Sequence, residues 1–165
     1  MYPRPPADAV AALRGLERRY RGLFAGLEDD ESPEDLAHRN GADGRSAIDH
    51  IVAASRTLTF LGRGIEQALV EDDPVLHPAV ADPAEREWPP AEGTVEDALA
   101  ELGRAATTLA DRVAHVPASS WDRHVRVAGH DATTTPLTVL WDAVDSAVAH
   151  LKHADTSLEQ ARRHR

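Results

Sequence analysis

The sequence predicts an all-α protein, a four-helix bundle with a long connection between its second and third helices. Two observations support this fold class. Apolar residues recur three and four positions apart in four segments, and this spacing places them on one face of a helix. Aromatic residues make up only 4% of the chain, so the core is built from Leu, Val, Ile and Ala, which favours packed helices over a sheet.

A single domain accounts for the whole chain. Its 165 residues suffice for a hydrophobic core, and the apolar content of 42% is that of an ordinary globular protein. No internal repeat and no change of composition marks a second unit. We therefore expect residues 1–165 to form one helical bundle domain.

The first helix is expected to follow the prolines of residues 3–6 and to end at the acidic run 28–31. A short helix from Ser32 to about Ala37 comes next, because Ser-Pro-Glu-Asp is typical of a helix cap and first turn. The apolar stripe of the first helix consists of Val10, Leu13, Leu16, Tyr20, Leu23, Phe24 and Leu27.

The second long helix is expected to begin at Ser46, with Asp49 three positions later as its capping-box partner. Its inner face consists of Ile48, Ile51, Val52, Ser55, Leu58, Ile65 and Leu69. His50 is about a quarter turn of the helical wheel away from this stripe, at about 100° per residue. It is therefore expected on the flank of the helix, near its first turn.

The middle of the chain is less regular. Residues 71–93 form a long connection rich in proline and acidic residues, and a loop of this length in a compact domain is usually functional or loosely ordered. Thr94 is expected to cap the third helix, and Pro117 to end it. Residues 121–134 alternate apolar and polar side chains and then break at a glycine, which indicates either a short hairpin or an extended loop.

The fourth helix carries both a core face and a row of polar side chains. Thr135 suits its cap, and Pro136 suits its first turn because the missing N–H has no helical partner there. Its apolar positions are Leu137, Leu140, Trp141, Val144, Val148, Leu151 and Leu158. Ser146, His150 and His153 follow one another at helical spacing on one flank, so they form a row of potential ligands.

Charge and composition narrow the classes of partner. The net charge of -10 argues against nucleic acid or an anionic membrane surface, since both require positive charge. The chain has no cysteine, which excludes disulfides, thiolate zinc sites and a cysteine nucleophile. We find neither an apolar signal segment nor a run of 18 apolar residues. A cytoplasmic protein that acts on a small molecule is expected.

Two histidines on different helices are the candidate metal ligands. If the second and fourth helices pack as neighbours, His50 and His150 point into one cleft, and Ser146 or His153 lies within a turn of His150. The alternative is that these histidines are solvated flank residues, because pairs at this spacing are common. Carboxylates near enough in sequence to support the histidines are Asp49, Asp142 and Asp145.

Three features resemble the DinB-like superfamily, which includes mycothiol- and bacillithiol-dependent transferases. Residues 32–55 read SPEDLAHRNGADGRSAIDHIVAAS and are similar to the segment that leads into the family's second helix, where a histidine precedes an apolar residue. The helix order, with a long connection before the third helix, is a further likeness. Residues 150–155 read HLKHAD and are similar to a His-x-x-His-Ala-Asp run on the last helix of the thiol-transferase branch.

The resemblance implies a divalent metal, often nickel or zinc, held by one histidine of the second helix and two of the last helix. His50 matches the first of these positions and His150 the last. The middle position is occupied by Ser146, which is a poor ligand for either metal. His153 is the substitute third ligand, so the expected metal ligands are His50, His150 and His153.

Two functions follow from these features. The first is a metal-dependent transferase or isomerase of the DinB-like superfamily, in which a low-molecular-weight thiol serves as cofactor. The alternative is a non-catalytic bundle that has lost its metal and binds a small molecule or forms a homodimer through an apolar helix face. Shared coordination requires the His50 and His150 nitrogens to lie within about 6 Å of each other, since Zn–N bonds are about 2 Å long.

Overall fold

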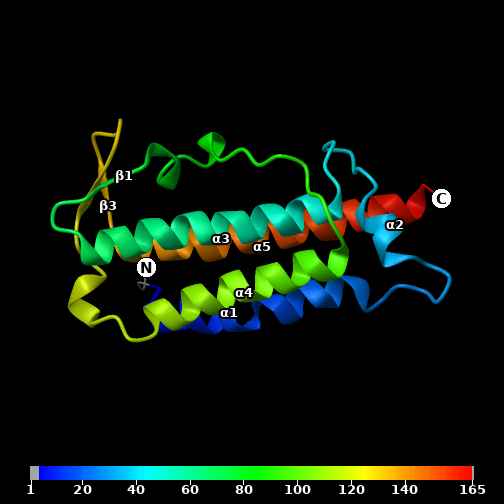
Figure 1. Ribbon diagram of the computed structural model, residues 1–165, viewed down its shortest axis with the longest axis horizontal. Helices are drawn as coiled ribbons and strands as arrows, with labels where there is room; N and C mark the ends of the chain where they lie inside the picture. The colour runs from blue at the N-terminus through cyan, green and yellow to red at the C-terminus, as the bar shows by residue number, and fades with distance from the viewer. Residues whose placement is uncertain (1–3, 165) are drawn as a thin grey trace.

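The computed structural model describes residues 4–164, and most of them are helical (Figure 1). The long helices are α1 (Pro6–Arg21), α3 (Ala47–Val70), α4 (Val95–Val113) and α5 (Pro136–Arg163), and α2 (Pro33–Ala37) is short. The strands are β1 (Val75–Leu76), β2 (Val125–Val127) and β3 (Thr133–Thr134). Short 3-10 turns are η1 (Gly22–Phe24), η2 (Pro78–Val80), η3 (Pro83–Glu85) and η4 (Ala118–Ser120).

The long helices pack side by side as a bundle. Helix α3 contacts α5 and α4, and α1 contacts α4 and α5, so each long helix has two neighbours. Figure 1 shows α3 and α5 running next to each other over most of their lengths, with α4 and α1 as a second pair. The prediction of a mainly helical bundle is confirmed, while the small sheet departs from a purely α-helical chain.

Local capping explains where the helices begin. The Ser46 hydroxyl accepts a hydrogen bond from the Asp49 backbone N–H at 3.3 Å, and the Asp49 carboxylate accepts one from the Ser46 N–H at 2.9 Å. This is the predicted capping box at the start of α3. The hydroxyl groups of Ser32, Thr94 and Thr135 cap α2, α4 and α5 in the same way. All four predicted starts are therefore confirmed.

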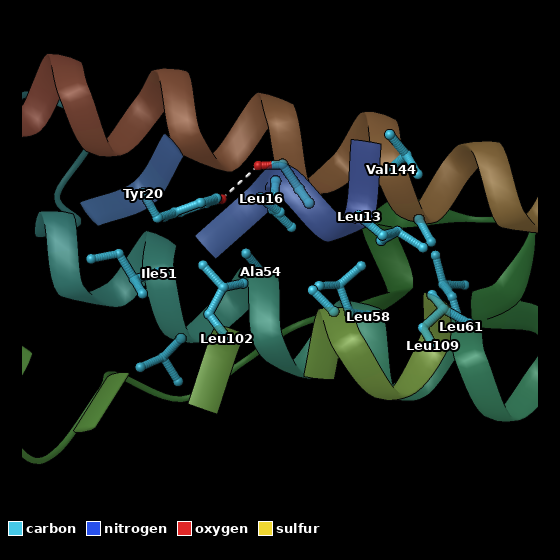
Figure 2. Close-up of a cluster of buried hydrophobic side chains, with 14 of the residues drawn as sticks. Leu13, Leu16, Tyr20, Ile51, Ala54, Leu58, Leu61, Leu102, Leu109 and Val144 are labelled. Atoms are coloured by element: carbon cyan, nitrogen blue, oxygen red, sulfur yellow. Dashed lines mark hydrogen bonds between the residues drawn. The ribbon is translucent and has the colours of Figure 1, made fainter. Parts of the chain in front are cut away.

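The core lies between the helices and is mostly aliphatic, with Tyr20 as its largest fully buried side chain. Figure 2 shows Tyr20 of α1 among leucines contributed by α1, α3 and α4. Its hydroxyl donates to the backbone oxygen of Ala147 on α5 at 2.5 Å. Burial raises the pKa of this phenol, so it remains a neutral donor. The bond ties the first helix to the last.

The connection between α3 and α4 is attached to the bundle. The Ala91 N–H donates to the Asp49 carboxylate at 2.8 Å, and the Trp88 indole N–H donates to the Thr57 hydroxyl at 3.2 Å. Strand β1 lies in this connection and pairs in parallel with β2, which pairs antiparallel with β3. The hairpin alternative for residues 121–134 is thus confirmed, whereas β1 was not predicted. Within residues 4–164, no helix combines the length and apolar character needed to cross a lipid bilayer.

Replacing Tyr20 with Phe should lower the free energy of unfolding by about 1 kcal/mol, because it removes one buried hydrogen bond and leaves the ring in place. Urea denaturation followed by circular dichroism measures the change. Val70→Ala is the control, since Val70 is 76% exposed and its truncation should change stability by less than about 0.5 kcal/mol. Equal stability of the Tyr20→Phe variant and the wild type would show that the α1–α5 bond contributes nothing.

Candidate functional site

The packing of α3 against α5 brings two of the candidate histidines into contact. The Nδ1 atoms of His50 and His150 lie 3.4 Å apart, although the residues are 100 positions apart in the chain. Their ring centroids are separated by 5.7 Å. The distance of 3.4 Å between the two nitrogens is well inside the limit of about 6 Å that shared coordination requires. The predicted close approach of the two imidazoles is therefore confirmed.

The two imidazoles differ in exposure, because His50 is buried and His150 is half-buried. His50 is only 2% exposed, so the alternative that it is a solvated flank residue is wrong. Burial lowers the pKa of His50, although the neighbouring Asp43 opposes the shift. Burial is the largest cause that lowers the pKa of His150 to about 4. The nearby charges of His50, His153 and Arg45 act in the same direction. Both rings are consequently neutral near pH 7, as metal-binding or proton-accepting imidazoles have to be.

A carboxylate that is not among the three predicted supporting carboxylates contacts His50. Oδ2 of Asp43 lies 2.9 Å from Nε2 of His50. Burial alone would raise the pKa of Asp43, but hydrogen bonds from the Arg45 backbone N–H and from His50 lower it. An ionised carboxylate can only accept a hydrogen bond, so this contact is a hydrogen bond when Nε2 of His50 carries a proton. The other ring nitrogen, Nδ1, faces His150.

The loop that carries this carboxylate is fastened to the last turns of α5. The Ala42 N–H donates to the Gln160 side-chain oxygen at 2.7 Å, and the Ser157 hydroxyl donates to the Arg45 backbone oxygen at 3.3 Å. Gly41 packs so closely that a Cβ atom there would lie 2.8 Å from the Ser157 hydroxyl oxygen. A side chain at position 41 would displace the loop. The geometry around His50 therefore depends on α5 at two separate places.

The other predicted ligands lie nearby without completing a site. The His153 ring meets the His50 ring edge-on, with centroids 5.2 Å apart, and His153 is exposed. Ser146 is half-buried one turn before His150. In the part of the chain that the structure describes, no group of three His, Cys, Asp or Glu side chains is arranged to hold a metal ion. The structure thus brings together His50 and His150, with His153 beside them.

The histidine pair nevertheless fits two neighbouring positions around a tetrahedral metal ion. Zn–N bonds of about 2.0–2.1 Å place adjacent nitrogens about 3.3 Å apart, close to the 3.4 Å between Nδ1 of His50 and Nδ1 of His150. Metal-bound histidines commonly donate their second N–H to a carboxylate, and Asp43 stands in that relation to His50. The remaining positions would be open to His153, to water or to a ligand.

The carboxylates expected to support the histidines have other roles. Asp49 caps α3 and accepts the Ala91 N–H. Asp145 forms a two-bond ion pair with Arg4, each bond 2.8 Å long. Burial raises the pKa of Asp142, although the charge of Arg86 opposes the shift. The carboxylate that contacts His50 is instead Asp43, which was not predicted.

Comparison of the sequence with protein-family models and with curated proteins gives no match. The resemblance to the DinB-like superfamily therefore stays a prediction, carried by the short sequence stretches described above.

Acid should destabilise the metal-free protein through His150. The pKa of His150 is about 4 in the folded state, and about 6.5 is expected in the unfolded chain, which therefore takes up the proton first as the pH falls. Stability that is fully present above about pH 6.5 is lost progressively towards about pH 4, by on the order of 2 kcal/mol. Urea unfolding at about pH 7.5 and about pH 4.5 measures this loss.

Two variants distinguish the contribution of His150 to the pH dependence of stability from the contributions of other titrating groups. A His150→Asn variant should lose less stability than the wild type over the same interval, whereas His115→Asn, at an exposed position, should lose as much. An equal pH dependence in all three proteins would contradict the lowered pKa of His150.

Proposed function

We propose that this chain is a DinB-like protein that binds a divalent transition metal, nickel or zinc, through His50 and His150, with His153 as the third ligand. The observation that carries the proposal is the 3.4 Å separation of the two Nδ1 atoms. Two neutral imidazoles from different helices supply nitrogen donors at a spacing suited to one ion. The Asp43 carboxylate beside His50 adds the outer support that such ligands usually have.

The chemistry proposed for the site is thiol transfer to a small electrophilic substrate, or an isomerisation that uses a bound thiol. A bound divalent metal would lower the pKa of a coordinated thiol or water, so that its conjugate base forms near neutral pH. The chain contains no cysteine, so the thiol would come from a low-molecular-weight cofactor. His50 and His150 would fix the position of the reacting group, and the burial of His50 would limit access of water from that side.

A second candidate is a non-catalytic bundle that has lost its metal and binds a small molecule or a second copy of the chain. Ser146 favours it, because serine replaces a histidine ligand at the position that the resemblance assigns. The lack of a three-residue ligand group among residues 4–164 also favours it. Metal binding therefore separates the two candidates.

Wild-type protein purified without a histidine tag should bind one equivalent of zinc or nickel in a calorimetric titration, even if it is purified with less metal. His50→Ala and His150→Ala should abolish this binding, because each removes one of the two facing nitrogens. The His115→Ala variant is the control, since His115 is an exposed histidine at the end of α4. Circular dichroism of each variant shows whether the bundle remains folded.

Two further variants define the third ligand. His153→Ala should weaken binding if His153 completes the site. Ser146→His should strengthen it about tenfold or more by restoring a histidine one turn from His150, whereas Thr138→His on a distant turn of α5 should have no effect. A folded wild-type protein that takes up neither metal would contradict the proposed metal site and leave the non-catalytic candidate.

A further inference from the structure

Three side chains from three segments form a continuous chain of contacts. Asp43 in the loop before α3 contacts Nε2 of His50 at 2.9 Å, and Nδ1 of His50 faces Nδ1 of His150 on α5 at 3.4 Å. The His50 side chain is 3% exposed and the Asp43 side chain 49%. A buried imidazole therefore lies between an anion on one side and a second imidazole on the other.

We propose that Asp43 is a positioning residue that holds His50 as the Nε2–H tautomer, so that the lone pair of Nδ1 faces Nδ1 of His150. The inference deepens the proposed metal site and rests on it for the effect on metal affinity. The tautomer itself is a property of the metal-free protein. It can therefore be measured whether or not a metal binds.

The two oxygens of Asp43 have separate roles. Oδ1 accepts the Arg45 backbone N–H at 2.9 Å, which closes the loop on itself, and Oδ2 contacts the His50 ring. Because Oδ1 is held in this way, the side chain has little freedom to turn Oδ2 away. The loop backbone is fixed on either side of Asp43, because the Ala42 N–H donates to Gln160 of α5 and the Ser157 hydroxyl of α5 donates to the Arg45 oxygen. The carboxylate is thus held against one ring nitrogen.

The consequence for His50 follows from the donor and acceptor capacity of each group. A neutral imidazole has one protonated nitrogen and one nitrogen with a free lone pair. An ionised carboxylate at Nε2 selects the form protonated there, as the aspartate does for the histidine of serine-protease triads. The His50 side chain is only 3% exposed and its Nδ1 faces a second imidazole, so both ring nitrogens have protein groups rather than bulk water as neighbours.

Replacing Asp43 with Asn tests the inference with minimal change of shape. The asparagine oxygen can still accept the Arg45 N–H, while its NH2 group replaces Oδ2 and points a donor at His50. Nε2 of His50 then has to accept, and the proton moves to Nδ1. We expect the wild type to show the Nε2–H form of His50 and Asp43→Asn to show the Nδ1–H form. Long-range 1H–15N NMR correlations of metal-free protein labelled with [15N]histidine distinguish the two.

Asp131→Asn is the matched control, because it removes one exposed acidic side chain from the loop between β2 and β3. It should leave the His50 tautomer unchanged. A His50→Ala sample identifies the His50 signals in each spectrum. Retention of the Nε2–H form in Asp43→Asn, or an Nδ1–H form in the wild type, would overturn the assignment of Asp43 as the positioning residue.

Metal affinity provides the second measurement. Loss of such supporting carboxylates typically weakens binding 10- to 100-fold, so Asp43→Asn should bind zinc about that much more weakly than the wild type and Asp131→Asn. If the tautomer inverts while the wild type binds no zinc, the positioning role holds and the proposed metal function fails. If the wild type binds zinc, and Asp43→Asn keeps the Nε2–H form and binds zinc equally well, the positioning role fails and the metal function holds.

Discussion

The contact between α3 and α5 is the constraint on which the candidate site depends. It brings together two imidazoles that are 100 positions apart in the chain, at a nitrogen separation of 3.4 Å. The Tyr20 hydroxyl, which donates to Ala147 one turn before His150, fixes α1 against the same helix. A shift of α5 along its axis would separate the histidines and break this hydrogen bond. The distance between the two histidines therefore depends on how the helices of the bundle pack.

Burial determines the chemical state of the histidine pair. Burial is the main cause of the lowered pKa values of His50 and His150, and the nearby charge of His50 lowers the pKa of His150 further. Asp43 adds one negative charge at the outer edge of the pair. In the proposed tautomer, the protonated nitrogen of His50 faces this carboxylate, and the nitrogen with the free lone pair faces His150. The site therefore offers nitrogen donors to a cation or accepts a proton.

The sequence predicted the local features of the fold and missed those that depend on distant contacts. Helix starts at Ser32, Ser46, Thr94 and Thr135 were predictable because each cap bonds to a residue three positions away. Strand β1 was not, because two residues carry no periodicity and it pairs with β2 about fifty positions later. The pairing of His50 with His150 was expected from the resemblance, whereas the burial of His50 and the contact from Asp43 depend on how the preceding loop folds against α5.

We propose that His50 and His150 bind one metal ion together at the α3–α5 interface. The most direct test is a crystal structure of the full chain grown with zinc, with diffraction data collected on both sides of the zinc absorption edge. If both histidines bind one zinc ion, we expect one strong anomalous peak about 2.0–2.1 Å from Nδ1 of both His50 and His150. Well-ordered helices with no peak between the two rings, or with His50 and His150 turned apart, would contradict it.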